Sequence, residues 1–257
     1  MVELILRAVS KTFSAVSEAR PVLCDIDLLI PKGEVVAIRG DNGCGKTTLL
    51  NMIAGLEIPT AGTIAFDGLH HQQLRIGYVQ QDYSSSLLPW YNVVDNVAIP
   101  LRLRGIGGAV SRNRAQEFLA ALGFRSLPPH AFPHELSGGQ KQKVAVARAL
   151  IHDPHLLLLD EPFANLDAHT GRDLEHVLSR THEDKHPTIL YVSHELDRCI
   201  MLADRVLTIH GLPARVVSDF KVTLPRPRCR DVMFSSQYAQ MRAQVLAQEE
   251  TLYGKPT

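Results

Sequence analysis

Short apolar-rich runs separated by polar stretches mark the first thirty residues. Leu4–Phe13 and Val22–Ile30 are runs of this kind, which indicates two strands. The polar stretch 14–20 between them predicts a hairpin connection, and Pro31-Lys32-Gly33 predicts a turn. We therefore expect an antiparallel β unit at the start of the chain.

Three later runs are almost continuously apolar, a pattern typical of strands that are buried on both faces of a parallel sheet. They are Val35–Ile38, His155–Leu159 and Thr188–Val192. Further strands are predicted at 63–67, 76–80 and 205–209, and the last of these is expected to be the final strand. Strands that alternate with helical segments in this way predict an α/β fold.

The middle third of the chain interrupts this alternation. Residues 81–90 are predicted to form a loop, and Tyr91–Leu122 is predicted to be helical in pieces. Breaks are expected at Pro100 and at the glycine-rich stretch 105–108, because proline and glycine disrupt helices. We expect a helical subdomain at about 82–150.

The stretch Gly40-Asp41-Asn42-Gly43-Cys44-Gly45-Lys46-Thr47 follows a predicted strand and leads into a helical segment that begins at Thr48. Strand, loop and helix are the context that the G-x-x-x-x-G-K-[ST] motif requires. Its glycines let backbone N–H groups face a phosphate, Lys46 reaches the β- and γ-phosphates, and Thr47 ligates Mg²⁺. Roughly one chain in a hundred of this length would carry such a match by accident. The sequence therefore predicts a phosphate site.

A second anion site is predicted at Leu136-Ser137-Gly138-Gly139-Gln140, before a helix expected at Lys141–Ile151. A hydroxyl, two glycines and exposed N–H groups at a helix N-terminus favour an anion. Taken alone, the segment would be an ordinary serine N-cap with a glycine turn. The neighbouring motifs favour the anion site.

Two acids end the second of the buried strands. Asp160 is placed to hold Mg²⁺ and Glu161 to orient the attacking water, because ligands of open α/β sheets lie beyond the carboxyl ends of the strands. A solvated turn is the alternative, and the predicted phosphate-binding loop (P-loop) at 40–47 makes it the less favoured one. His194 follows another buried strand and either contacts a γ-phosphate oxygen or opens a helix. Phe13 either stacks on a purine or packs as an edge-strand core residue.

Composition narrows the class of protein further. The chain has 27 Lys and Arg residues and 27 Asp and Glu residues, so no net charge attracts nucleic acid. The basic stretch 225–230 lacks the interleaved aromatic residues that nucleic-acid binding would favour. The four cysteines form no CxxC pair, which favours a reduced compartment. Neither a signal peptide nor an apolar run of membrane-spanning length is evident. We expect a soluble cytoplasmic protein that binds no nucleic acid.

Taken together, the motifs resemble the ATP-binding cassette of ABC transporters in their order and spacing. They are Gly40–Thr47, Gln81, Leu136–Gln140, Leu156–Glu161, Asp167 and His194. The Leu-Ser-Gly-Gly-Gln signature discriminates most, because other P-loop families do not carry it. The resemblance implies a P-loop NTPase core with a mixed sheet, an N-terminal antiparallel β subdomain and an inserted helical subdomain. It also implies a cassette at 1–220 and a C-terminal extension at 221–257 with a short helix.

The resemblance assigns a role to each motif. Phe13 would stack on adenine, residues 40–48 would bind the phosphates of ATP, and His194 would contact the γ-phosphate. Glu161 would polarise the water, Asp167 would communicate across a dimer, and Ser137–Gln140 would bind the ATP held by a second copy. Mg²⁺ would be held by Thr47, Gln81 and Asp160, with Gln81 also sensing the γ-phosphate.

A narrower resemblance covers nearly the whole chain. Four further segments resemble the nitrate/sulfonate/taurine class of bacterial importers. They are Leu87–Trp90, Asp95–Val97, Leu202–Val206 and Leu224–Arg228. In that class the loop that carries Trp90 faces the membrane subunit, although an isolated Trp is more often a core residue. Phe13 stands in place of the usual Tyr, and Lys141 and Lys143 stand in place of Arg, but the catalytic positions match.

The expected function is that of an ATPase subunit that powers a separate membrane permease for a small solute such as nitrate, sulfonate or taurine. It would lie at the cytoplasmic face of the inner membrane, form an ATP-dependent homodimer and depend indirectly on an extracytoplasmic solute-binding protein. A soluble ABC protein of DNA repair or translation is the first alternative, and the chain lacks the coiled coils, zinc hooks or second cassette of those proteins. A P-loop kinase for a small metabolite is the other, disfavoured by the signature.

Overall fold

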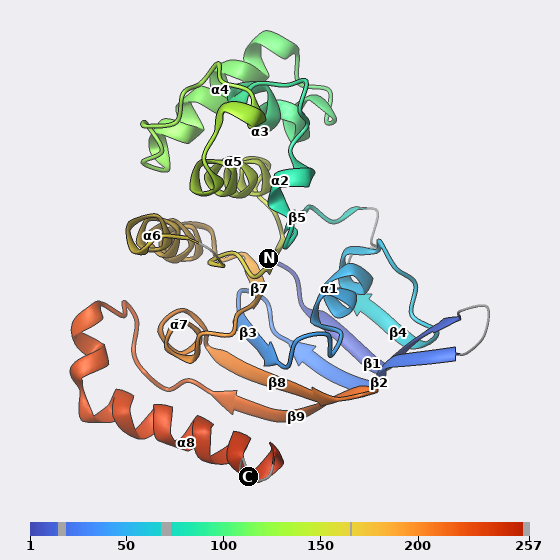
Figure 1. The fold of residues 1–257 in the computed structure, drawn as a ribbon. Coiled ribbons are helices and arrows are strands. Elements are labelled where there is room, and N and C mark those ends of the chain that lie inside the picture. Colours follow the sequence, from blue (N-terminus) through green and yellow to red (C-terminus); the bar gives the residue numbers. More distant parts are fainter. Residues whose placement is uncertain (15–18, 68–72, 165, 254–257) are drawn as a thin grey trace. The chain divides into compact units, whose positions relative to one another are not determined.

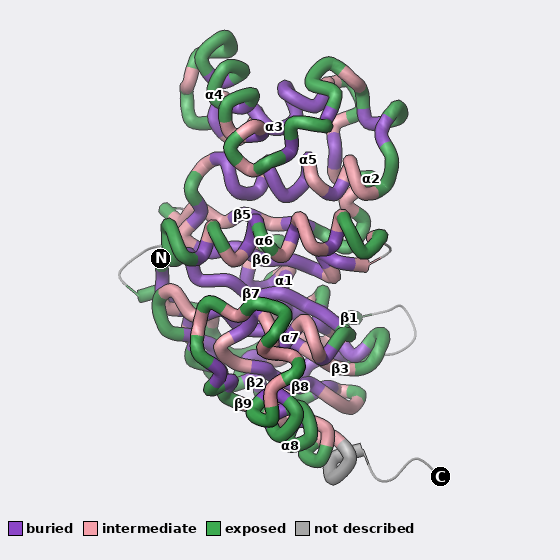
Figure 2. The backbone as a smooth tube through the Cα atoms, turned by 90° about the vertical axis from the view of Figure 1, so that its left-hand side faces the viewer, coloured by how far each residue is buried: buried purple, intermediate pink, exposed green. Residues whose placement is uncertain are grey.

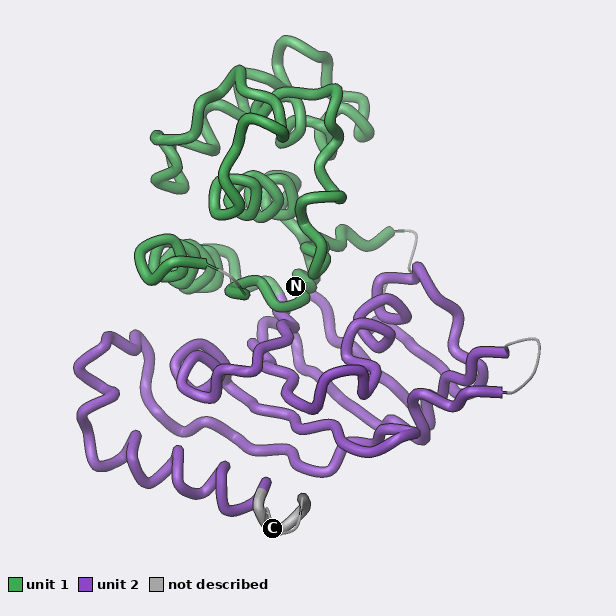
Figure 3. Tube along the Cα trace, viewed as in Figure 1, with its two compact units in different colours: residues 1, 72–187 green, residues 2–71, 188–257 purple. Residues whose placement is uncertain are grey.

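The computed structural model describes residues 1–14, 19–67, 73–164 and 166–253 (Figure 1). The chain divides into two compact units, coloured separately in Figure 3. Unit 1 comprises Met1 and residues 72–187, and unit 2 comprises residues 2–71 and 188–257. The middle of the chain therefore folds as one unit, while its two outer parts fold together as the other.

Unit 2 is built on seven strands in the order β4-β1-β2-β9-β8-β3-β7. They are β1 (Leu4–Ser14), β2 (Ala19–Ile30), β3 (Val35–Gly40), β4 (Ala61–Phe66), β7 (Thr188–Val192), β8 (Arg205–Gly211) and β9 (Ala214–Lys221). The pairs β1–β2 and β1–β4 are antiparallel, which confirms the predicted N-terminal antiparallel part. Strand β3 runs parallel to both β7 and β8, so the sheet is mixed as predicted.

The apolar pattern explains which strands of unit 2 are central. Every residue of β7 is buried, as are the first four residues of β3. Strands with both faces covered need such continuous apolar runs, whereas every residue of β9 after Ala214 is half-buried or exposed. The helices of unit 2 are α1 (Lys46–Ala54), α7 (Leu196–Leu202), the 3₁₀ helix η3 (Arg230–Phe234) and α8 (Ser236–Tyr253).

Unit 1 contains the parallel pair β5 (Ile76–Val79) and β6 (Leu156–Asp160) and most of the helices. The helices are α2 (Tyr83–Ser86), α3 (Val93–Arg102), α4 (Gly108–Ala121), η2 (Pro133–Glu135), α5 (Gly138–Leu150) and α6 (Ala168–Lys185). Helix α3 packs on both α4 and α5, and buried positions line these helices (Figure 2). Helices thus follow one another between β5 and β6, as the predicted insertion requires.

Three local predictions were wrong. The strand at 205–209 was expected to be the last, but β9 follows it. The half-polar sequence of β9 lacks a continuous apolar run, so it gave no strand signal. Strand β9 forms because it pairs with antiparallel β8. Helix α3 continues through Pro100, which lies in its last turn, where the missing N–H removes a single bond and the helix ends at Arg102. The loop expected at 81–90 contains the one-turn helix α2, whose N-cap Asp82 accepts from the N–H of Ser85. The break at 105–108 was correct.

All four cysteines lie in the described part of the chain and are free thiols. Cys44 and Cys199 are buried, Cys24 is half-buried and Cys229 is exposed. Among the helices that the structure describes, none combines the length and apolar character needed to cross a bilayer.

One buried amide holds the loop that carries Trp90. Asn96 of α3 is completely buried, and its Oδ1 accepts from the N–H of Leu88 at 2.9 Å. Its Nδ2 donates to the carbonyl oxygens of Leu88, Tyr91 and Asn92 at 3.1, 2.8 and 3.1 Å. A helix residue therefore replaces water for the polar backbone atoms of this loop.

We predict that Asn96→Ala lowers the free energy of unfolding by about 1–3 kcal/mol, because the N–H of Leu88 loses its acceptor and several carbonyl groups lose a donor. Chemical denaturation measures the loss, and amide exchange at Leu88 should accelerate. Asn92→Ser provides the control, because serine preserves the cap of α3. Unchanged stability in Asn96→Ala would show that water satisfies these groups equally well.

Candidate active site

The glycines of the predicted phosphate loop adopt conformations that other residues rarely reach. Gly40 ends β3 with φ +152°, and Gly43 and Gly45 have φ +77° and +106°. A Cβ added at Gly40 would collide with the carbonyl oxygen of Ile209, and one at Gly45 would lie 2.7 Å from Val22 Cγ1. The glycine spacing is therefore required by the local backbone and by the neighbouring strands.

Lys46 begins α1 and lies inside this loop. Its side chain is buried, and Nζ donates to the carbonyl oxygens of Gly40 and Asp41 at 2.9 and 2.8 Å. These neutral acceptors hold the ammonium without cancelling its charge. The N-cap Gly45 has no side chain with which to cap the first turn of α1, so the helix N-terminus and the ammonium both favour an anion. The loop thus fits the phosphates of a nucleotide.

His194 shares a cavity with this loop. A polar cavity of about 320 Å³ in unit 2 is lined by Arg39, Gly40, Asp41, Asn42, His194 and Glu249. The structure therefore brings His194 to the front of the P-loop, as a contact with a terminal phosphate would require. Asp41 Oδ2 lies 2.8 Å from Nδ1 of His210, which follows Ile209 on β8.

The other predicted site residues of unit 2 differ in burial. Cys44 is buried, and burial raises the pKa of its thiol, so it acts as a packing residue of the loop. Thr47 is exposed and Thr48 half-buried in the first turn of α1. The Phe13 ring is 39% exposed, with Lys11 Nζ 4.8 Å from its centroid, so it is not the core residue that the alternative interpretation required.

In unit 1, Asp160 and Glu161 occupy contrasting positions at the end of β6. Asp160 is buried, and burial followed by the charge of Asp160 raises the pKa of Tyr78 on the neighbouring strand β5. Glu161 is half-buried and has φ +50°, a left-handed conformation that is uncommon for a residue other than glycine. The regular backbone of β6 therefore ends at Asp160, and the two neighbouring carboxylates differ in burial. Gln81, which follows β5, is exposed.

The signature segment forms a capping box at the start of α5. Ser137 Oγ accepts from the N–H of Gln140 at 3.3 Å, and Gln140 Oε1 accepts from the N–H of Ser137 at 2.9 Å. The hydroxyl hydrogen of Ser137 can still donate, and Ser137 and Gly138 are exposed. The serine is thus the N-cap that the simpler interpretation described, on an exposed helix N-terminus that can also bind an anion.

Asp167 is the N-cap of α6. Oδ1 accepts from the N–H groups of His169 and Thr170 at 2.9 and 3.0 Å, and Oδ2 accepts from the Thr170 hydroxyl at 2.7 Å. These hydrogen bonds, led by those from Thr170, lower the pKa of Asp167 to about 2. Both carboxylate oxygens therefore have partners within unit 1.

Three further residues belong to this description and were not predicted from the sequence. Arg39 and Glu249 line the cavity that contains His194, although 210 positions separate them. Gln142 of α5 is buried and donates from Nε2 to the carbonyl oxygen of Pro162, after the two acids, at 2.8 Å. A polar residue on the inner face of a predicted helix was the available signal for Gln142. Nothing in the sequence pairs Arg39 with Glu249.

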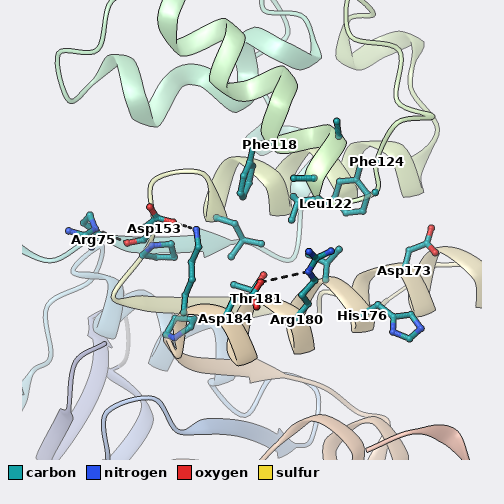
Figure 4. Close-up of a pocket in the computed structure, with 18 of the residues that line it drawn as sticks. Arg75, Phe118, Leu122, Phe124, Asp153, Asp173, His176, Arg180, Thr181 and Asp184 are labelled. Carbon is teal, nitrogen blue, oxygen red and sulfur yellow. Dashed lines mark hydrogen bonds and ion pairs between the residues drawn. The ribbon is translucent and has the colours of Figure 1, made fainter. Parts of the chain in front are cut away.

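Unit 1 contains another cavity, of about 950 Å³ (Figure 4). Phe118 and Leu122 line it from α4 and the following turn, and Arg180 and Asp184 line it from α6. None of the residues predicted to bind ATP or metal lines this cavity. This cavity is therefore separate from the predicted nucleotide-binding residues.

Comparison with known proteins agrees with these motifs. The family model described as "ABC transporter" matches residues 23–164. The chain is 40% identical over 245 residues, 95% of it and 84% of the relative, to "Aliphatic sulfonates import ATP-binding protein SsuB 2" of Pseudomonas aeruginosa. It is 35% identical, over 96% of its length and 92% of the relative, to "Uncharacterized ABC transporter ATP-binding protein MJ0412" of Methanocaldococcus jannaschii.

Solved structures give the same result. The cassette MJ0796, described as a dimeric post-hydrolysis state bound to ADP and Pi, matches 86% of this chain and 100% of its own with TM-score 0.76 and 31% identity. A second dimeric structure of MJ0796 gives TM-score 0.77 at 30% identity, with the same coverage. The chain belongs to the ABC transporter family. It is an ABC-type ATPase with the predicted P-loop NTPase fold.

We predict that the cap formed by Asp167 makes stability depend on pH. Because the folded-state pKa lies below the ordinary value of 3.8, the ionised carboxylate stabilises the fold above pH 3.8, and this contribution is lost as the pH falls from 3.8 towards about 2. Asp167→Asn keeps a capping oxygen without the charge. Its melting temperature should lie below that of the wild type at pH 6, and the gap should narrow below pH 4. A gap independent of pH would exclude a contribution from the charge.

Proposed function

We propose that this protein is the ATP-hydrolysing subunit of an importer and drives a separate membrane permease for a small solute of the nitrate, sulfonate or taurine class. The observation that carries the proposal is the P-loop, in which Lys46 is buried and whose first residues, 40–42, share a cavity with His194. The names of the aliphatic sulfonate import relatives support the importer role. Neither the repair and translation alternative nor the kinase is favoured by any of the matches described above.

ATP and Mg²⁺ are the proposed ligands. Residues 40–48 would bind the phosphates, the exposed Phe13 ring would stack on adenine, and Thr47, Gln81 and Asp160 would hold Mg²⁺. Hydroxyl, amide and carboxylate oxygens are the hard ligands that Mg²⁺ prefers, so the donor set fits. When bound, the metal would neutralise charge on the phosphates. The cassette would occupy about 1–220, with the helical subdomain at 82–150 and residues 221–257 as an extension.

Hydrolysis requires a base for the attacking water and donors for the charge that develops on the γ-phosphate. Glu161 is the proposed base, and its left-handed backbone supports a functional role because such conformations concentrate at active sites. His194 would donate to the γ-phosphate. The Lys46 ammonium would stabilise the same charge from inside the loop.

A second copy would complete the site. Ser137 and the N–H groups at Gly138 and Gly139 lie at an exposed helix N-terminus, where they could reach the ATP of a partner copy. Exclusion of water by that partner would strengthen each donor. The dimeric state of the solved cassettes supports this arrangement.

The permease would bind near Trp90. This Trp is 66% exposed, on a loop whose backbone Asn96 fixes, so a rigid aromatic side chain is presented to a partner. Through this contact the protein would lie peripherally at the cytoplasmic face of the inner membrane. A solute-binding protein on the other side would deliver the solute.

We predict that Glu161→Gln keeps ATP binding but lowers turnover by a factor of about 10²–10⁴, the usual cost of losing a general base. With Mg-ATP this variant should sediment as a dimer, because closure is allowed and the hydrolysis that reopens it is not. Adding Ser137→Arg should abolish the dimer while each monomer still binds ATP. A dimer that persists in the double variant, or forms equally without ATP, would remove the role in the partner's site assigned to Ser137.

We predict that Trp90→Ala reduces co-purification with the permease at least severalfold, since aromatic anchors dominate such interfaces. Phe234→Ala is the matched control, because Phe234 is 89% exposed and lies in unit 2. Equal recovery of permease with both variants would contradict the docking role. Circular dichroism of each variant checks that the fold is retained.

A further inference from the structure

The C-terminal helix α8 presents one face to the rest of unit 2. Tyr238, Arg242, Val245 and Glu249 follow one another at spacings of four, three and four residues, which places them along a single side of a helix. Tyr238 and Val245 are 4% and 2% exposed. Tyr238 and Val245 are buried and attach the helix. Polar groups of the same row reach two points close to His194 in the sequence or in space: Tyr238 and Arg242 reach one, and Glu249 reaches the other.

The first point is Arg39, at the end of β3. Its Nη1 donates to Glu249 Oε1 at 2.7 Å, with the two side chains only 16% and 12% exposed. Its Nη2 lies 3.4 Å from the carbonyl oxygen of His194, a long contact of a kind that tightens when a site closes on its ligand. Thr208 Oγ1 also donates to Glu249 Oε1 at 3.3 Å, which fixes the carboxylate from β8.

The second point is Asp197, in the first turn of α7. Its Oδ1 accepts from the Tyr238 hydroxyl at 2.7 Å and from Arg242 Nε at 2.8 Å. These bonds, led by the one from Tyr238, lower the pKa of Asp197. Helix α8 is therefore bonded directly to Asp197 and, through Arg39, to the main chain at His194.

We propose that Arg39 and Glu249 are positioning residues that hold His194 at the front of the P-loop, so that the C-terminal helix sets the rate of hydrolysis. This inference rests on the role proposed above for His194. Glu249 fixes one arm of the planar guanidinium, and the other arm is thereby directed at the His194 backbone. Such a fork needs two donors in fixed geometry, which arginine has and lysine lacks.

Helix α8 lies outside residues 23–164, the part of the chain that the family model matches. The MJ0796 structures are matched over their whole length, whereas 86% of this chain is matched, so this chain contains segments that those cassettes lack. The sulfonate import relatives, by contrast, match up to 99% of it.

The test compares full-length variants by steady-state ATP hydrolysis. Arg39→Lys keeps the charge opposite Glu249 but loses the fork, and Glu249→Gln keeps the shape but loses the ion pair. Each should lower kcat on the order of tenfold, because a displaced catalytic group loses its alignment, while KM for ATP changes less than twofold. Ser218→Ala is the control: it removes the bond from Ser218 to Gln248, the neighbour of Glu249 on α8, and should leave kcat unchanged.

Combination with His194→Ala separates the possible outcomes. If Arg39 acts through His194, Arg39→Lys should lower kcat no further in the His194→Ala background. An equal further loss there, or normal kcat in both Arg39→Lys and Glu249→Gln, would overturn the inference and leave the proposed function intact. If His194→Ala itself hydrolyses ATP normally, the role proposed for His194 fails instead. Melting temperatures within a few degrees of the wild type exclude loss of fold as the cause of any of these losses.

Discussion

The pairing of β3 between β7 and β8 is the constraint on which the chemistry of unit 2 depends. The parallel register sets Ile38 opposite Val192 and Gly40 opposite Ile209, so three strands end at one edge of the sheet. The P-loop and His194 follow β3 and β7 at that edge, and His210 is the penultimate residue of β8. An added Cβ at Gly40 would collide with the Ile209 carbonyl, so only glycine fits at the point where the loop leaves the sheet. Strand pairing thus assembles residues that are distant in the sequence.

Much of this could be predicted because the signals are local. The P-loop, the buried strand at 188–192 and the acids after β6 were each indicated by an apolar run joined to a short polar motif. Strand β9 depends on its pairing with β8 and has little signal of its own. The contact of Arg39 with Glu249 depends on the docking of a helix far along the chain, which no local pattern encodes. Sequence motifs therefore predicted the reacting groups, and tertiary structure was needed to find the residues that contact them.

Two motif residues also have plain structural roles. Ser137 and Asp167 each cap a helix of unit 1, and the bonds they make satisfy N–H groups that would otherwise lack partners. A substitution at either position therefore alters the helix start as well as any ligand contact. Loss of activity alone could not separate these effects, whereas variants that preserve the cap can.

The bonds made by Asn96 bear on how such subunits diversify. All of them reach main-chain atoms of residues 88–92, so they do not depend on which side chains that loop carries. The residues of the loop that face outward, Trp90 among them, can be exchanged over evolution while its backbone keeps the same course. One internal amide thereby fixes the path of the loop independently of the side chains that the loop presents.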